Sequence, residues 1–124
     1  MDLHAILVAT DFSLCACAAF KAAKTLGQRL DAKIILLHVI NSGVLERLAE
    51  YLKVEAESLI PEMREKAQQQ MQAFLEKCSA QEREVEFMVA VGIPFQEIAV
   101  IARDLAVDLV VMGGYGRRGR GPIE

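Results

Sequence analysis

The chain has 124 residues, a formal net charge of −3 at pH 7 and a hydrophobic fraction of 53%. Such a length is typical of one domain, and the apolar fraction supports a sizeable aliphatic core, since the sequence contains no Trp. The negative charge disfavours nucleic acid as a partner, because nucleic-acid binding requires a broad basic face. A membrane is not expected as a partner either, since no apolar run approaches the roughly 20 residues of a bilayer span.

The N-terminal third predicts a strand, a helix and a second strand. Residues 4–10 form a continuous apolar run, which is typical of a strand buried on both faces. Asp11 and Ser13 follow in a turn, and either can cap a helix over residues 14–30, where apolar residues recur at helical spacing. Residues 33–40 form the second apolar run. This order predicts a βαβ unit with parallel strands and a right-handed crossover.

The middle of the chain predicts a long helical segment. Residues 44–78 repeat apolar side chains at helical spacing, with charged and Gln residues between them. Pro61 cannot continue an undisturbed helix, because it lacks the backbone N–H and clashes with the preceding turn. We therefore expect either one kinked helix or two pieces, the second starting near Pro61 and running to about Cys78.

The last part of the chain completes an α/β pattern. It predicts a third strand over residues 85–91, a helix over residues 95–106 with Pro94 at its first position, and a fourth strand over residues 108–112. Strands that alternate with helices in this way predict a doubly wound, Rossmann-like parallel sheet with helices on both faces. Ligands of such sheets bind beyond the carboxyl ends of the strands, where the strand order reverses.

The turn after the fourth strand has the composition of a phosphate-binding loop. Gly113, Gly114 and Gly116 permit positive φ and close approach of a ligand, and successive amide N–H groups in such a turn bind anions. Arg117 is the first of three arginines that follow, and guanidinium groups suit phosphate oxygens. The alternative is a glycine–arginine segment that contacts nothing. If the first and fourth strands are neighbours, Asp11 faces this loop and accepts a hydrogen bond from a base or ribose; its alternative role is to cap the following helix.

The remaining reactive side chains indicate no catalytic or metal site. Cys15 and Cys17 are two apart on a predicted helix and point to different faces, which makes them a poor metal pair. Together with Cys78 they are expected to be small, reduced core residues of a cytoplasmic protein, since three cysteines are an odd count. His4 and His38 lie beside or within strands and are interpreted as satisfied structural histidines. No serine or acidic pair has the spacing of a catalytic motif.

Four stretches of the sequence match a known family. They are Ile6-Leu-Val-Ala-Thr-Asp-Phe-Ser13, Ile35-Leu-Leu-His-Val39, Gly92-Ile-Pro94 and Asp108-Leu-Val-Val-Met-Gly113. In this order they make the chain resemble a universal stress protein domain. The resemblance implies a five-stranded sheet in the order 3-2-1-4-5, which makes the first and fourth strands neighbours. It also implies cytoplasmic localisation, homodimers and, in one branch, binding of ATP, alone or with Mg²⁺.

The ATP-binding branch supplies candidate site residues. The resemblance places adenine and ribose contacts at the ends of the first, second and fourth strands, and a phosphate contact on the second glycine of the loop. Ala9 stands where many ATP-binding members have proline or a small residue. No catalytic residue or metal ligand is implied, so we expect at most a weak ATPase. The expected cofactor-binding residues are Ala9, Thr10, Asp11, Val39, Met112, Gly113, Gly116 and Arg117.

The chain departs from the family pattern after Gly116. The ATP-binding loop has the form G-x2-G-x9-G-[ST], and its third glycine would fall at position 126, past Glu124. The expected single domain over residues 1–124 therefore has four strands and lacks the final helix and the fifth strand. ATP binding is expected to be weakened, and the fourth strand to become an apolar edge. We expect a nucleotide-binding stress-response module; the alternative is a nucleotide-free dimerisation and interaction module of the same family.

Overall fold

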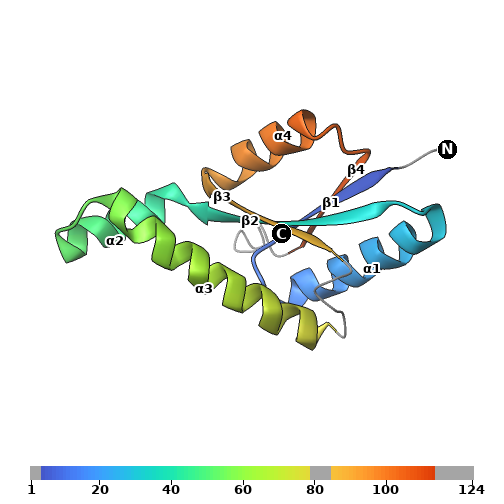
Figure 1. Ribbon diagram of the computed structural model, residues 1–124, viewed down its shortest axis with the longest axis horizontal. Helices are drawn as coiled ribbons and strands as arrows, with labels where there is room; N and C mark the ends of the chain where they lie inside the picture. The colour runs from blue at the N-terminus through green and yellow to red at the C-terminus, as the bar shows by residue number, and fades with distance from the viewer. Residues whose placement is uncertain (1–3, 79–84, 114–124) are drawn as a thin grey trace, which may run out of the picture.

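The computed structural model describes residues 4–78 and 85–113, and these contain four strands and four helices (Figure 1). Each strand starts and ends within one residue of its predicted bounds, and Pro94 is the first residue of its helix, as predicted. No helix in these ranges is long and apolar enough to cross a membrane. In chain order the elements are β1 (Ala5–Thr10), α1 (Leu14–Leu30), β2 (Lys33–Asn41), α2 (Ser42–Leu52), α3 (Ala56–Lys77), β3 (Glu86–Gly92), α4 (Pro94–Asp104) and β4 (Leu109–Gly113).

The sheet has the order β3-β2-β1-β4, and all its pairs are parallel. Helices α1 and α3 cover one face, and α4 covers the other (Figure 1). The chain passes from β1 to β2 and β3 on one side and then returns to β4 on the other side of β1. The predicted doubly wound α/β fold is therefore confirmed, and its strand order reverses at β1.

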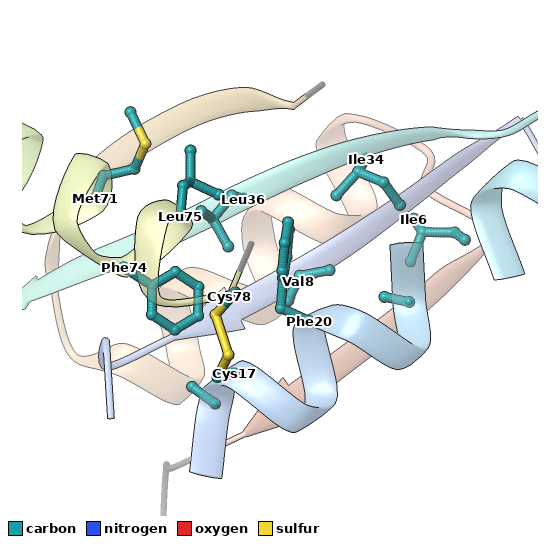
Figure 2. Packing of buried hydrophobic residues seen from close by; sticks show 12 residues of the cluster. Ile6, Val8, Cys17, Phe20, Ile34, Leu36, Met71, Phe74, Leu75 and Cys78 are labelled. Carbon is teal, nitrogen blue, oxygen red and sulfur yellow. A yellow bond between two sulfur atoms is a disulfide. The ribbon is translucent and has the colours of Figure 1, made fainter. Parts of the chain in front are cut away.

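Two apolar cores lie on the two faces of the sheet. Ile6 and Val8 of β1 pack with α1 and α3, whereas Leu7 and Ala9 pack with α4 (Figure 2 shows the first core). All six residues of β1 are buried, which explains why the sequence shows a continuous apolar run rather than an alternation.

The carboxylate of Asp108 fixes the start of β1. It accepts hydrogen bonds from the backbone N–H groups of His4, at 2.6 Å, and Ala5, at 3.1 Å. These two bonds hold the pKa of Asp108 below its usual value. They also align the first residues of β1 with the start of β4, so the register of this pair is set at the amino end and carried to the carboxyl end.

The helical segment between β2 and β3 is divided into two pieces, but the predicted boundary near Pro61 is wrong. Helix α2 ends because Lys53 adopts a left-handed conformation, with φ of 60°, and its N–H donates to the carbonyls of Ala49 and Glu50. Pro61 instead lies inside α3. There its missing N–H removes the bond to the carbonyl of Glu57, a loss that one turn of a long helix tolerates.

Gly27 allows the end of α1 to approach the sheet closely. A Cβ atom built at this position would lie 2.9 Å from Cδ1 of Ile34 and 3.0 Å from the backbone oxygen of Ala32. The carbonyl of Gly27 also accepts the N–H of Ala32 at 2.9 Å, which ends the helix and turns the chain into β2. The glycine is therefore required by packing, although it lies inside a helix.

We predict that Gly27→Val lowers the free energy of unfolding by about 1–3 kcal/mol, because the added methyl groups press on the backbone of the turn. Urea denaturation at neutral pH measures the change. The matched control is Gln28→Val, an exposed neighbour on the same helix, for which a change within about 0.5 kcal/mol is expected. Equal losses in the two variants would show that close packing at position 27 does not determine the effect.

Candidate functional site

The carboxyl ends of β1 and β4 meet where the strand order reverses. Thr10, the last residue of β1, lies opposite Gly113, the last residue of β4. Neighbouring strands are about 4.8 Å apart, so the acidic turn after β1 begins directly beside Gly113 at the end of β4. This is the position at which ligands bind in open parallel sheets.

The described candidate residues converge on this edge of the sheet. Ala9 is fully buried between Leu37 and Met112, its partners on β2 and β4. Val39 lies near the end of β2 and is also buried, whereas the side chain of Met112 is 42% exposed. The structure therefore brings together six of the eight candidates. Gly116 and Arg117 lie outside the described residues.

Four hydrogen bonds shape the turn after β1. The hydroxyl of Thr10 accepts the N–H of Phe12 at 2.9 Å, and Oδ1 of Asp11 accepts the N–H of Ser13 at 2.9 Å. Oγ of Ser13 accepts the N–H of Ala16 at 3.2 Å, which makes Ser13 the N-cap of α1. The carbonyl of Thr10 receives the fourth bond, from His38. Of the two capping alternatives the structure selects Ser13, and Asp11 instead bends the turn toward the cap.

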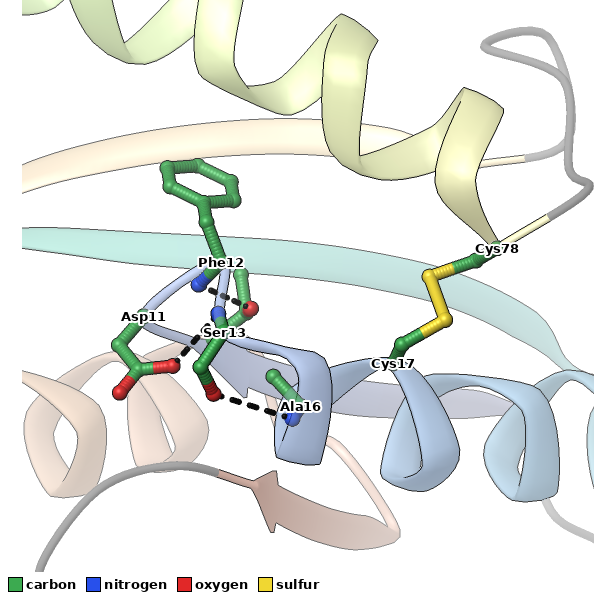
Figure 3. Close-up of a disulfide and its surroundings, with 7 residues drawn as sticks. Asp11, Phe12, Ser13, Ala16, Cys17 and Cys78 are labelled. Carbon is green, nitrogen blue, oxygen red and sulfur yellow. Dashed lines mark hydrogen bonds between the residues drawn. A yellow bond between two sulfur atoms is a disulfide. The ribbon is translucent and has the colours of Figure 1, made fainter.

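Phe12 holds an unusual conformation in this turn. Its φ is 66°, a left-handed value that bulky residues rarely adopt. Its ring stacks on His38 with centroids 4.5 Å apart and meets Phe74 of α3 edge-on at 5.7 Å. Figure 3 shows Phe12 pointing toward α3 and Asp11 pointing the opposite way. The aromatic contacts therefore support a turn that presents a carboxylate away from the core.

His38 connects β2 to the turn. Its Nδ1 lies 2.9 Å from the carbonyl oxygen of Thr10, and because a carbonyl only accepts, Nδ1 carries the proton and donates. Burial lowers the pKa of His38 below its ordinary value of 6.5, while the bond to Thr10 and the charge of Asp11 oppose the shift. The interpretation of His38 as a satisfied histidine agrees with this bond, although no sequence pattern indicates that its partner is the turn.

A cavity of about 280 Å³ opens beside His38, between the end of β2 and the helices α2 and α3. Its lining combines His38 and Val39 with Lys66 and Gln70 of α3. Sequence reasoning missed the two residues of α3. No pattern marks them, because they reach this place only through the way α3 packs across the sheet.

Cys17 and Cys78 correct the expectation that all cysteines are reduced core residues. They are buried, as expected, but they form a disulfide between α1 and the end of α3 (Figure 3). The sequence could not pair them, since 61 positions separate them. The side chain of Cys15 lies outside the described part of the chain. Within residues 4–78 and 85–113, no group of three or more His, Cys, Asp or Glu side chains is arranged to hold a metal ion.

Comparison with known proteins finds several proteins that are similar to this chain. Universal stress protein MJ0577 of Methanocaldococcus jannaschii is 30% identical over an alignment that covers 90% of this chain and 76% of the relative. The solved structure of MJ0577 superposes with a TM-score of 0.74, covering 99% of this chain and 83% of that one. Universal stress protein UspA from Lactobacillus plantarum gives a TM-score of 0.67 at 26% identity, with 98% and 85% covered.

A further solved structure shares the fold alone. It is a universal stress protein in complex with cAMP, 18% identical, with a TM-score of 0.54 over 89% of this chain and 71% of its own. The model of the universal stress protein family matches residues 3–123, nearly the whole sequence. The order of the strands, the turn after β1 and these matches agree, and the chain belongs to the universal stress protein family.

Proposed function

We propose that the protein is a stress-response regulatory module that binds an adenine nucleotide, ATP, at the carboxyl edge of β1 and β4. The observation that carries the proposal is the register of this pair, in which Thr10 lies opposite Gly113. It supports a site between the carboxylate-bearing turn and Gly113, a combination suited to a ribose or base and a phosphate chain. The role requires no catalytic step.

The base is proposed to contact the main chain of β2. Pairing between β1 and β2 ends at Ala9 and Leu37, whereas pairing of β2 with β3 continues to Asn41 and Gly92. The side of Val39 that faces β1 therefore lies beyond the last β1 partner. A purine edge hydrogen-bonds well to backbone N–H and C=O groups in such a position.

The phosphates are proposed to lie over the start of α1 and the glycine turn. Helix α1 begins at this edge, directly after its cap Ser13, and the N-terminus of a helix attracts phosphate through its unpaired N–H groups and its dipole. Gly113 is placed to allow close approach. Gly116 and Arg117 are proposed to complete the phosphate contacts, with or without Mg²⁺.

Cytoplasmic residence and homodimer formation belong to the same proposal. Strand β4 is at the edge of the described sheet, and its side chains Val110 and Met112 are 37% and 42% exposed. An apolar edge of this kind favours association. The nucleotide, bound at the end of the same strand, would then influence what the domain pairs with.

A second candidate function is an interaction module that needs no nucleotide. Helix α2 presents Val44, Leu48, Tyr51 and Leu52 to solvent, and this spacing places them on one side of the helix. Tyr51 is 83% exposed. An exposed apolar side of a short helix is typical of a surface that receives a partner. Under this alternative, ATP neither binds nor alters association.

We predict that the full chain binds ATP in calorimetric titrations with and without Mg²⁺, and that Asp11→Asn weakens binding about tenfold to a hundredfold. The substitution removes a charged acceptor, whose hydrogen bond contributes about 1.5–3 kcal/mol. The turn is preserved, because the Asn side-chain oxygen still accepts the N–H of Ser13. cAMP serves as a second adenine ligand in the same titrations.

The matched control is Asp104→Asn, which removes the same charge from the C-terminal end of α4, where Asp104 pairs only with the adjacent Arg103 among the described residues. Its affinity for ATP should equal that of the unaltered chain. Absence of ATP binding by the unaltered chain, together with unchanged association, would favour the interaction module instead.

We predict that unfolding becomes easier as pH falls below about 6.5, and that His38→Gln loses part of this dependence. The pKa of His38 is lowered in the folded chain. The unfolded chain therefore binds more protons just below pH 6.5, and the free energy of unfolding decreases there as pH decreases. Urea titrations between about pH 7.5 and 5.5 measure the two slopes. The same pH dependence of the free energy of unfolding in both proteins would show that a group other than His38 binds the proton.

A further inference from the structure

The disulfide between Cys17 and Cys78 lies beside the proposed nucleotide site. The two Cα atoms are 5.7 Å apart, within the range of about 4.4–6.8 Å that is usual for disulfides. The residues are 8% and 3% exposed, so the pair is held by the packed core on the α1 and α3 face (Figure 2). The bond therefore links two helices that are already in contact.

Each cysteine lies four residues after a residue that supports the acidic turn. The N–H of Cys17 donates to the carbonyl of Ser13, the cap of α1, at 3.3 Å. The N–H of Cys78 donates to the carbonyl of Phe74 at 3.0 Å, and the ring of Phe74 contacts Phe12. The disulfide thus ties the end of α3 to the start of α1, beside the acidic turn that leads into α1 (Figure 3).

We propose that Cys17 and Cys78 are a reversible redox-modification site, whose disulfide holds α3 against the acidic turn and thereby raises the affinity for nucleotide. The inference rests on the proposed ATP site. In the oxidised chain, Phe12 is kept in its left-handed conformation by Phe74, so the carboxylate of Asp11 is already oriented before the ligand binds. A preorganised site loses less conformational entropy on binding.

The oxidant has the chemistry of a low-molecular-weight disulfide such as glutathione disulfide. The thiolate of Cys17 attacks one of its sulfur atoms, which forms a mixed disulfide and releases one small thiol. The thiolate of Cys78 then attacks the Cys17 sulfur and releases the second small thiol. Two protein thiols are oxidised, one small disulfide is reduced, and the two protons pass to the released thiolates. Cys17 is assigned the first attack, because it is the more exposed and lies in the first turn of α1, where the helix dipole stabilises a thiolate.

The test begins by counting thiols in the full chain after equilibration with oxidised or reduced glutathione. Maleimide labelling of the denatured protein should modify one cysteine in the oxidised form and all three in the reduced form. Calorimetric titration should then show that reduction weakens ATP binding about fivefold or more, the size of a typical coupling between two sites. Cys78→Ser should bind like the reduced chain in both buffers. The matched control Cys15→Ser should respond to glutathione as the unaltered chain does.

A second measurement separates failure of the switch from failure of the nucleotide proposal. The imidazole of His38, which stacks on Phe12, reports the packing of the turn by NMR titration. On reduction, its pKa should rise toward the ordinary value, whether or not ATP is present. Equal ATP affinity of the oxidised and reduced chains would contradict redox control of binding but would not contradict the proposed ATP site. Absence of ATP binding in both forms would overturn the ATP site, and an unchanged pKa of His38 would then overturn the switch as well.

Discussion

The packing of β1 in the middle of the sheet is the constraint on which the other features depend. Its six residues are buried on both faces and paired on both edges, so a shift by one residue would exchange the side chains that fill the two cores. Asp108 fixes its start against β4. Because the register is fixed at one end, Thr10 and Gly113 must emerge together at the other end.

The turn after β1 couples the packing on one face of the sheet to the orientation of side chains at the carboxyl edge. Phe12 occupies a costly backbone conformation, and it persists because hydrogen bonds and the rings of His38 and Phe74 surround it. A contact between Phe74 of α3 and Phe12 of this turn thus helps to orient the carboxylate of Asp11. The same turn carries the cap of α1, so the positive end of that helix faces the edge as well.

Family membership and local geometry make different contributions to the functional argument. The match over residues 3–123 shows the family, and the strand order shows the fold, in which ligands commonly bind at the carboxyl ends of the strands. Fold alone does not establish a ligand, because one architecture carries many functions. The proposal of an adenine nucleotide depends on the acidic turn, Gly113 and the side of β2 near Val39 that lies beyond its last β1 partner. Those features belong to this chain and can be altered one at a time.

The sequence by itself determined the strands and the α/β class, because apolar runs such as residues 4–10 and 33–40 are explained by burial on two faces. It also predicted the ends of the first and fourth strands to within one residue, because Asp11 and Gly113 interrupt the apolar runs there. The end of α2 was misplaced because a left-handed Lys53, rather than Pro61, ends that helix, and such a conformation has no strong sequence signal. Only the tertiary structure paired Cys17 with Cys78 and brought Lys66 to His38. These are contacts between distant segments, and they depend on how α3 packs across the sheet rather than on any local pattern.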